Sequence, residues 1–256
     1  MDTTHPDGGA ADPSAAAEPR MTFRVPPAFH ELPVWETPEL VGEALIELAQ
    51  DIYPQGDAEL WFQYAAAQLP LVGEMMADGI SYAGFCLLDL DGRRSTATVT
   101  ATLLESVPDG QKMTASSIAA ELAGSGEGTQ VETVWLAAGE AVARFTSEIM
   151  NLPAEITDSG QPEDVEIGKI TVFLPLRRHA EMALFELSTP CMQDWDLYSE
   201  LFFSIVNTLE VADAERPAGE PVPQQPEDGS ANWPSNVVAH GVEVPLQTKS
   251  VRDVFG

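Results

Sequence analysis

The spacing of apolar residues changes near Gly79, and this change limits the folds open to the chain. Before Gly79, apolar residues recur every three or four positions, which is the period of an α-helix. After it, they largely alternate with polar residues, which is the period of a β-strand. The clearest case is "STATVTATLLE" at 95–105, where threonines at 96, 98, 100 and 102 alternate with apolar residues at 97, 99, 101 and 103. The sequence therefore predicts two long helices followed by an extended antiparallel sheet.

Turn signals divide the second half of the chain into three hairpins. Asp91-Gly92 is a favoured pair for a tight hairpin turn, and it joins the runs 80–90 and 95–105. A second hairpin is predicted around Gly139 and a third at Arg177-Arg178-His179. An opening strand is predicted within residues 21–34, where Pro26-Pro27 indicates an edge position. These signals together give about seven strands.

Four helices are expected beside these strands. Their predicted ranges are 38–52, 57–78, 113–123 and 192–209. Thr37 followed by Pro38 is typical of a helix start, and Pro70 predicts a kink or break in the second helix. The fold class is therefore α+β. We expect an antiparallel, meandering sheet of about seven strands with helices packed on its faces, as in an α/β/α sandwich.

The stretch "STPCMQDW" at 188–195 leads abruptly from the last strand into the last helix, so its role is either chemical or architectural. Pro190 cannot extend a strand ladder because it lacks an amide hydrogen, and Ser188 or Thr189 is expected to cap the helix. Residues spaced three or four apart give this helix one buried face: Trp195, Tyr198, Leu201, Phe202, Ile205, Val206 and Leu209. We expect an architectural junction that holds the helix against the sheet.

Residues 166–211 resemble the C-terminal hairpin and helix of actinobacterial proteins with a PsbP-like α/β/α sandwich. The shared motifs are a strand ending F-x-x-S-T-P, here at 185–190, and an acidic, aromatic helix closing I-x-x-T/S-L, here at 205–209. The chain departs from that family in placing two long helices between the first strand and the first hairpin. Members of that family are generally non-catalytic accessory, assembly or lipoprotein-type binding modules, so the resemblance implies a binding role.

The two ends of the chain differ in composition from its middle. Residues 1–20 are rich in Ala, Asp, Gly, Pro and Ser and predict a disordered tail. One domain is expected over 21–211, followed by a Pro- and Glu-rich linker over 212–235. Residues 236–256 regain Val, Leu and Phe, and we interpret them as a short docking segment, the alternative being a floppy tail. The candidate partner-binding residues in that segment are Val251, Val254 and Phe255.

The chain is strongly acidic, with a formal charge of −29. Such a charge repels phosphate, which argues against nucleic acid or an anionic membrane surface as a partner. No apolar run is long enough to span a membrane, and residues 1–20 lack the apolar core of a secretory signal. We therefore expect a cytoplasmic protein whose partner is another protein, with its oligomeric state left open.

The sequence carries no recognisable catalytic motif. Cys86 and Cys191 are expected to be small buried residues, and two cysteines with four scattered histidines do not predict a metal site. We expect no cofactor. The enzymatic alternative is a hydrolase whose acids and base come from Asp89, Asp91, Glu132 and His30. A third possibility is a small molecule bound between the helix at 57–78 and the sheet.

Three aromatic residues near the start of the second helix are candidate partner-binding residues: Trp61, Phe62 and Tyr64. Phe62 lies off the apolar stripe of that helix and is expected to be exposed, whereas packing within the domain is the alternative for the cluster. Arg144 is expected to pair with Glu132 or Glu148. The favoured function is a non-enzymatic protein-interaction module, an accessory or cargo protein of a bacterial secretion or injection assembly.

Overall fold

The structure is a computed structural model that describes residues 20–105, 113–124, 129–154, 157, 159–176, 181–212, 240–244 and 248–250. The helices are α1 (Val41–Ile52), α2 (Ala58–Ala77), α3 (Ala115–Leu122) and α4 (Trp195–Asn207), with the short 3-10 helix η2 (Met192–Asp194) before α4. The strands of the larger sheet are β2 (Phe29–Glu31), β3 (Tyr82–Leu90), β4 (Arg93–Glu105), β5 (Gln130–Leu136), β6 (Gly139–Leu152), β7 (Glu163–Pro175), β8 (Glu181–Thr189) and β11 (Thr248–Ser250). The smaller sheet contains β1 (Arg20–Val25), β9 (Glu210–Ala212) and β10 (His240–Val244).

Seven strands of the larger sheet pair in the order β2-β3-β4-β8-β7-β6-β5, and every neighbouring pair on this path is antiparallel. The three predicted hairpins are confirmed as β3–β4, β5–β6 and β7–β8. The turn of the first hairpin holds Asp91 at φ 56° and Gly92 at φ 79°, the left-handed conformation that Asp-Gly pairs favour. The predicted α+β class, an antiparallel sheet with four helices packed on it, is also confirmed.

The sheet does not follow chain order throughout. After β4 the chain passes through α3 to β5 at the far edge, and β6, β7 and β8 then return strand by strand until β8 pairs with β4. The predicted meander is therefore interrupted once, and β8 lies in the middle of the sheet. The short strand β11 adds to β4 in the parallel direction opposite residues 103–105, beyond Ala101, where the pairing of β4 with β3 ends.

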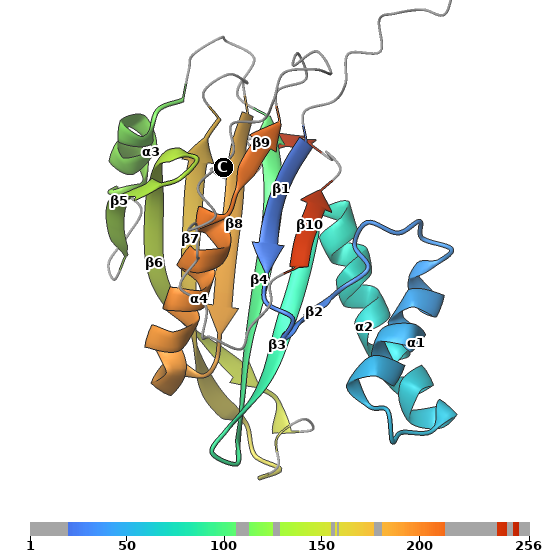
Figure 1. Ribbon diagram of the computed structural model, residues 1–256. Helices are drawn as coiled ribbons and strands as arrows, with labels where there is room; N and C mark the ends of the chain where they lie inside the picture. The colour runs from blue at the N-terminus through green and yellow to red at the C-terminus, as the bar shows by residue number, and fades with distance from the viewer. Residues whose placement is uncertain are drawn as a thin grey trace, which may run out of the picture.

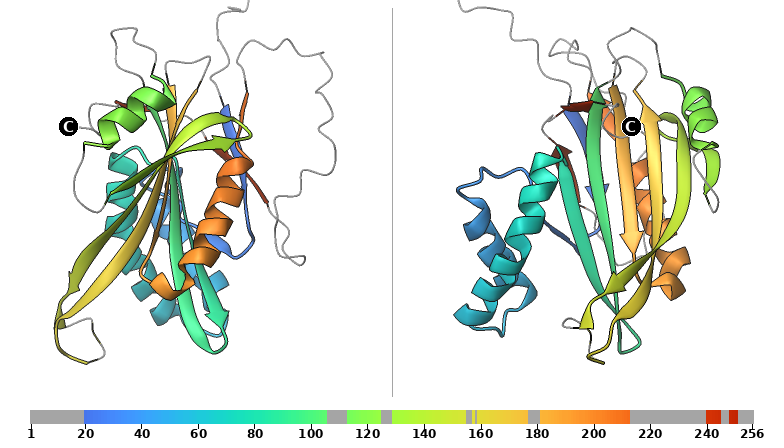
Figure 2. Two further views of the ribbon diagram at one scale, coloured as in Figure 1. Left: turned by 90° about the vertical axis from the view of Figure 1, so that its left-hand side faces the viewer. Right: turned by 180° about the vertical axis from the view of Figure 1, so that it is seen from behind.

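The molecule has three layers, with the larger sheet in the middle (Figure 1). α4 and the smaller sheet cover the face that points to the viewer in Figure 1, which we call the front face. α1 and α2 pack beside β3, and α3 packs over β6 and β7, on the opposite back face. Seen from behind, the middle of the back face lies between these two groups, with none of the described helices over it (Figure 2, right).

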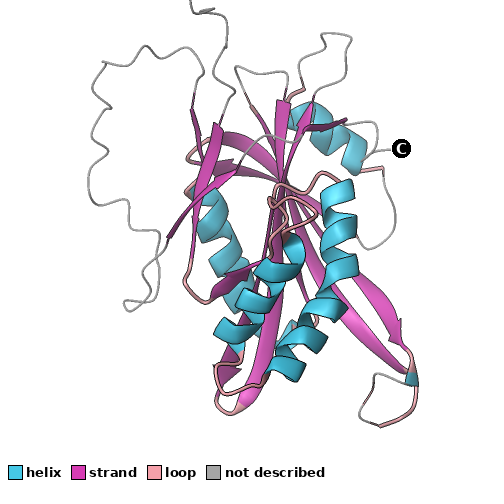
Figure 3. Cartoon of the chain, turned by 90° about the vertical axis from the view of Figure 1, so that its right-hand side faces the viewer, coloured by secondary structure: helices cyan, strands magenta, loops and turns pink. Residues whose placement is uncertain are grey.

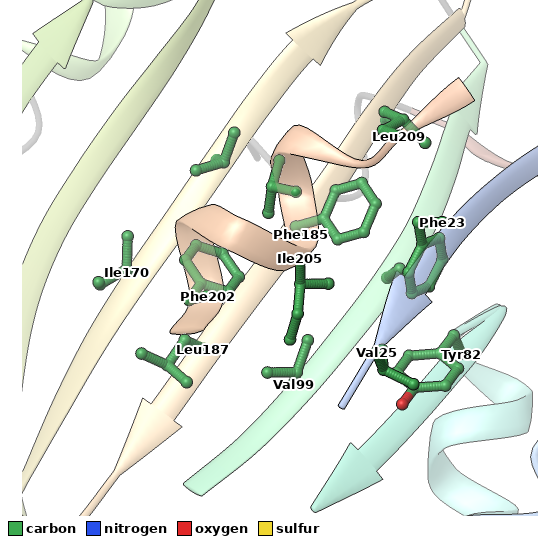
Figure 4. Close-up of a cluster of buried hydrophobic side chains, with 14 of the residues drawn as sticks. Phe23, Val25, Tyr82, Val99, Ile170, Phe185, Leu187, Phe202, Ile205 and Leu209 are labelled. Carbon is green, nitrogen blue, oxygen red and sulfur yellow. The ribbon is translucent and has the colours of Figure 1, made fainter. Parts of the chain in front are cut away.

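The front face contains the main hydrophobic core. On β4 the apolar residues predicted to share one side are 1% exposed or less, whereas the threonines at 98 and 100 are half-buried on the other side. Figure 4 shows side chains of β4, β7 and β8 meeting Phe202 and Ile205 of α4. Fully burying one such side chain contributes about 1.5–3 kcal/mol. Apolar contact is therefore what holds α4 to the sheet.

Residues 21–34 form two strands in two different sheets, which corrects the prediction of one strand. β1 buries alternate side chains against the front face, and the Phe23 ring lies 5.1 Å from the rings of both Tyr82 and Phe185. After Pro26-Pro27 the chain enters β2, an edge strand of the larger sheet, as the prolines indicated. Neither proline has an amide hydrogen, so neither can continue the ladder of β1 or of β2.

Side chains cap the starts of α2 and α3, whereas the predicted cap of the first helix at Thr37 does not form. Asp57 Oδ1 accepts from the Leu60 N–H at 2.9 Å at the start of α2, and Thr114 and Ser117 form a reciprocal capping box at the start of α3. α1 begins at Val41 rather than at Pro38, because the residues after Thr37 form a turn on its backbone carbonyl and its side chain makes no capping bond.

Pro70 does not break α2, which runs continuously from Ala58 to Ala77. The proline has no amide hydrogen, so the Ala66 carbonyl lacks its usual helix donor. Ala65 and Val72, on either side of the proline, are both buried against α1 and its neighbours. Packing on both sides of Pro70 keeps the helix in one piece.

The smaller sheet brings the C-terminal region back to the domain. β10 pairs with β1 on one side and β9 pairs with it on the other, both antiparallel. The segments 1–19, 213–239 and 251–256, on which most of the tail and linker predictions fall, lie outside the described residues, so those predictions stay predictions. Among the described helices, none combines the length and the apolar content that crossing a membrane requires.

Replacing Phe202 by alanine is expected to lower the free energy of unfolding by about 3–5 kcal/mol, because it removes a fully buried ring from the front-face core. Phe62→Ala is the matched control: that side chain is 66% exposed, and the expected loss is below about 0.5 kcal/mol. Chemical denaturation followed by circular dichroism measures both. Equal losses in the two variants would contradict the packing of α4.

Candidate functional site

A polar network ties the start of α4 to the β3–β4 hairpin. The Arg93 guanidinium donates two hydrogen bonds of 2.7 Å to the two carboxylate oxygens of Asp194, 101 positions away in the chain. The Ser95 hydroxyl donates to the same carboxylate, and the Tyr198 hydroxyl donates to Ser95 at 2.7 Å. Four side chains thus join β4 to the beginning of α4.

The network keeps the Asp194 carboxyl group ionised. Hydrogen bonds from Arg93 and then from Ser95 lower the pKa of the Asp194 carboxyl to about 2, because both bonds stabilise the ionised form. The Asp194 side chain is 10% exposed and that of Arg93 is 44% exposed, so the pair lies at the protein surface. A carboxylate held ionised in a two-pronged ion pair positions a helix and is poorly suited to transferring protons.

Thr189 forms a second link at this junction. Its hydroxyl donates to the Thr96 carbonyl at 2.7 Å and accepts from the Cys191 N–H at 3.0 Å. The residues that precede η2 and α4 make no side-chain capping bond. The prediction that Ser188 or Thr189 caps the helix is therefore wrong, because Thr189 ends β8 and lies too far ahead of the first turn of α4.

A glycine allows this junction to approach the sheet closely. At Gly168 on β7, a Cβ atom would lie 2.5 Å from Met192 Sδ and 2.6 Å from the Trp195 ring. These two side chains therefore occupy the space that a side chain at position 168 would need. Glycine in a strand interior is typical of such close approaches.

The two cysteines are part of the packing around the junction. Cys86 is 1% exposed, and burial raises the pKa of its thiol to about 11. Cys191 is half-buried, and its sulfur accepts from the Thr96 N–H at 3.4 Å. The buried Cys86 thiol stays protonated at neutral pH, which makes it a poor nucleophile and a poor metal ligand. The polar groups and thiols of the junction hold β4, β8 and α4 together, so the junction is architectural.

The carboxylates of the hydrolase hypothesis do not converge. Asp89 and Asp91 lie at the tip of the β3–β4 hairpin, where Asp89 accepts from a backbone N–H of the turn. Glu132 lies on β5 at the opposite edge, five strand spacings or about 24 Å across the sheet. His30 lies on β2 with its ring 5.6 Å from that of Phe85, and burial lowers its pKa. Within the described ranges, no three or more His, Cys, Asp or Glu side chains are grouped to hold a metal ion.

Two cations lie on β6 and β7 of the back face. Lys169 forms an ion pair of 2.6 Å with Glu148 across β6 and β7. Arg144 lies over the Phe173 ring at 5.6 Å, and its buried Nε has no hydrogen-bond partner among the described residues. The prediction that Arg144 pairs with Glu132 or Glu148 is therefore wrong, because Lys169 occupies Glu148 and the guanidinium stacks on an aromatic ring instead. The small-molecule alternative stays a prediction.

The predicted aromatic cluster of α2 divides into two kinds of residue. Trp61 and Tyr64 are half-buried and organise the α1–α2 turn: Trp61 Nε1 donates to the Tyr53 carbonyl at 3.0 Å, and the Tyr64 ring lies 5.9 Å from that of Tyr53. Burial raises the pKa of Tyr64 to about 12. Phe62 is 66% exposed, as expected from its position off the apolar stripe. Of the three aromatics, Phe62 is the one that the fold presents to solvent.

α2 is apolar on its outer side as well as on the side that packs against α1. Thirteen of its twenty residues are exposed, and three of these, Glu59, Gln63 and Glu74, are polar. The large exposed side chains lie along its two edges, with Leu60 and Leu71 on one edge and Phe62 and Leu69 on the other. We call this surface, with the small residues between them, the outer face of α2; α1 and α2 are turned toward the viewer in Figure 3. A helix that is apolar all round is normally covered on both sides, so this face is the candidate functional site.

The sequence pattern predicted the exposure of Phe62 but not that of Leu60, Leu69 and Leu71. The signal for them was present, because residues 58–77 contain four polar side chains in twenty positions. That number is too small to give a helix of this length a solvated side. The other predicted partner-binding residues, Val251, Val254 and Phe255, lie outside the described residues.

Comparison with protein-family models, with curated proteins and with solved structures finds no match to this chain. The resemblance of residues 166–211 to PsbP-like proteins therefore stays a prediction. The candidate site is defined by the exposure and composition of α2 itself.

Asp194→Asn is expected to remove part of the pH dependence of stability. The folded-state pKa lies near 2, below the ordinary value of 3.8, so the carboxylate stabilises the folded protein above about pH 4 and this contribution is lost as the pH falls toward about 2. The difference in unfolding free energy between wild type and variant should shrink over that range. Urea denaturation at a series of pH values measures it, and Arg93→Gln should follow the same course. A difference that stays constant would contradict the pairing.

Gly168→Ala is expected to cost about 1–3 kcal/mol of unfolding free energy, because the added Cβ overlaps the Trp195 ring unless the start of α4 shifts. Gly42→Ala is the matched control, since nothing lies within 4 Å of a Cβ at that position in α1, and alanine there should be neutral or stabilising. Denaturation midpoints rank the two variants. A neutral result at position 168 would mean that the junction is loosely packed.

Proposed function

We propose that the chain is a protein-interaction module that binds a partner protein on the outer face of α2. The observation that supports this proposal is the exposure, between 41% and 66%, of Leu60, Phe62, Leu69 and Leu71 on one helix. Several large apolar side chains exposed on one element of a folded domain are typical of an interaction site. Such side chains add nothing to the stability of the fold while they are exposed to water, whereas covering them on binding removes apolar area from water, which is favourable.

The packing of α2 against α1 and β3 holds this surface rigidly in place. The inner side of α2 contributes Ala65 and Val72 to a buried cluster that includes Leu45 of α1 and Ala83 of β3. Trp61 closes the α1–α2 turn through its bond to the Tyr53 carbonyl. A helix already fixed by its inner side loses little conformational freedom when a partner covers its outer side.

The wider setting is part of the proposal and rests on the PsbP-like resemblance and on the tail predictions. We place the chain as an accessory or cargo protein of a bacterial secretion or injection assembly. A C-terminal region that acts as a tether would raise the local concentration of the partner at the domain.

A photo-crosslinking amino acid at position 62 tests the proposal in cells that make the protein naturally. A partner adduct of one defined mass is expected from position 62, because the Phe62 side chain lies within the proposed interface. Position 149 is the control, since Ile149 is exposed to a similar extent, 65%, on β6. Adding Leu69→Ser to the same chain should remove the adduct while changing the unfolding free energy by less than about 0.5 kcal/mol. No adduct at position 62, or equal adducts at both positions, would contradict the proposal.

A further inference from the structure

The charge of the helical hairpin formed by α1 and α2 indicates the chemistry of its partner. This inference rests on the proposed function of the outer face of α2. Residues 32–81 contain α1 and α2 and include nine acidic residues and no Lys, Arg or His. The hairpin therefore has a formal charge of −9, and eight of the nine acidic residues are exposed. No cation within the hairpin can neutralise them.

The acidic residues of α2 lie within its exposed side, near the two ends of the helix. On α2, Glu59 lies one turn before Phe62 and Glu74 lies one turn after Leu71, so each end of the outer face has a carboxylate. The neighbouring helix α1 exposes only polar side chains, and these are Glu43, Glu47, Gln50 and Asp51. The result is an apolar surface with an acidic rim.

The rim argues against several occupants. A second copy of the chain would bring another hairpin of charge −9 against the first, and like charges facing each other across an interface weaken it. A phosphate-bearing partner, either nucleic acid or an anionic lipid surface, meets the same repulsion. Charge complementarity favours a partner that is basic where it meets the rim.

We propose that the occupant is an amphipathic helix of a partner protein whose apolar stripe is flanked by Lys and Arg. Between the large side chains of the outer face lie Ala66, Ala67 and Gly73, which leave shallow places where the ridges of a second helix can pack. Apolar anchors at helical spacing are the usual way in which such a helix binds.

Two synthetic helical peptides test this inference on the full-length chain. Both carry the same leucines at i, i+3, i+4 and i+7, and one has lysines and the other glutamates at the flanking positions. Fluorescence anisotropy measures the Kd of each labelled peptide over a range of salt concentrations. The lysine peptide is expected to bind, with a Kd that rises with salt, and the glutamate peptide is expected not to bind.

Three double variants separate the role of charge from that of the apolar surface. Glu59→Gln with Glu74→Gln should raise the Kd of the lysine peptide roughly 2- to 30-fold, as expected for the loss of two exposed ion pairs. Glu166→Gln with Glu200→Gln removes the same charge from exposed positions on β7 and α4 and should change the Kd less than about twofold. Phe62→Ser with Leu69→Ser should abolish binding.

Failure of the inference and failure of the proposed function give different results. The inference is overturned if the lysine peptide does not bind, if both peptides bind equally, or if the two glutamine pairs have equal effects, since that last result would mean general attraction to an acidic protein. If the lysine peptide binds and the Phe62→Ser, Leu69→Ser variant binds it as well as wild type does, the proposed use of the outer face of α2 fails instead.

Discussion

The contact between α4 and the front face of the larger sheet is the interaction on which the rest of the structure depends. Phe202 and Ile205 of α4, together with Phe23 of β1, lie against side chains of β4, β7 and β8, and all three are 1% exposed or less. Without them the front face would present a continuous apolar surface to water, because alternate residues of β4 from Ala97 to Leu103 point that way. The same contact brings β9, which follows α4, to the position where it pairs with β1.

The polar groups at the β8–α4 junction support this packing, and the packing brings their hydrogen-bond partners within reach. Ser95 is 1% exposed, and its hydroxyl bonds to both Tyr198 and Asp194, so a buried polar group has its partners within the protein. A serine, an aspartate and a tyrosine in hydrogen-bond contact could suggest a catalytic set, but here each one is used to hold a strand to a helix. These polar groups are used within the fold. The side chains proposed to bind a partner are instead the exposed apolar and acidic ones of α2.

Local signals predicted much of the fold, and long-range pairing was what they did not show. Asp91-Gly92 and Gly139 marked their hairpins, and the helical spacing from Trp195 to Leu209 marked α4, because each signal is complete within about fifteen residues. The pairing of β8 with β4 and the division of residues 21–34 between two sheets depend on how the whole sheet packs, which adjacent residues do not encode. At the candidate site the sequence predicted Phe62 but not its neighbours. A helix that is apolar on every side does not reveal which side its partner α1 will cover.

The pairing of β1 with β10 determines how the chain responds to a pulling force. Met21 lies opposite Val244, so the first strand enters the ladder and the returning strand leaves it at the same end. A force applied from the C-terminal side first detaches β11 from β4 and then loads the β10–β1 hydrogen bonds one after another, beginning near Val244. A cellular unfoldase that pulls on that end would remove the short strands β11 and β10 with little resistance, while β9 still pairs with β1 and α4 still covers the core. The first mechanical barrier on that path is therefore the buried helix.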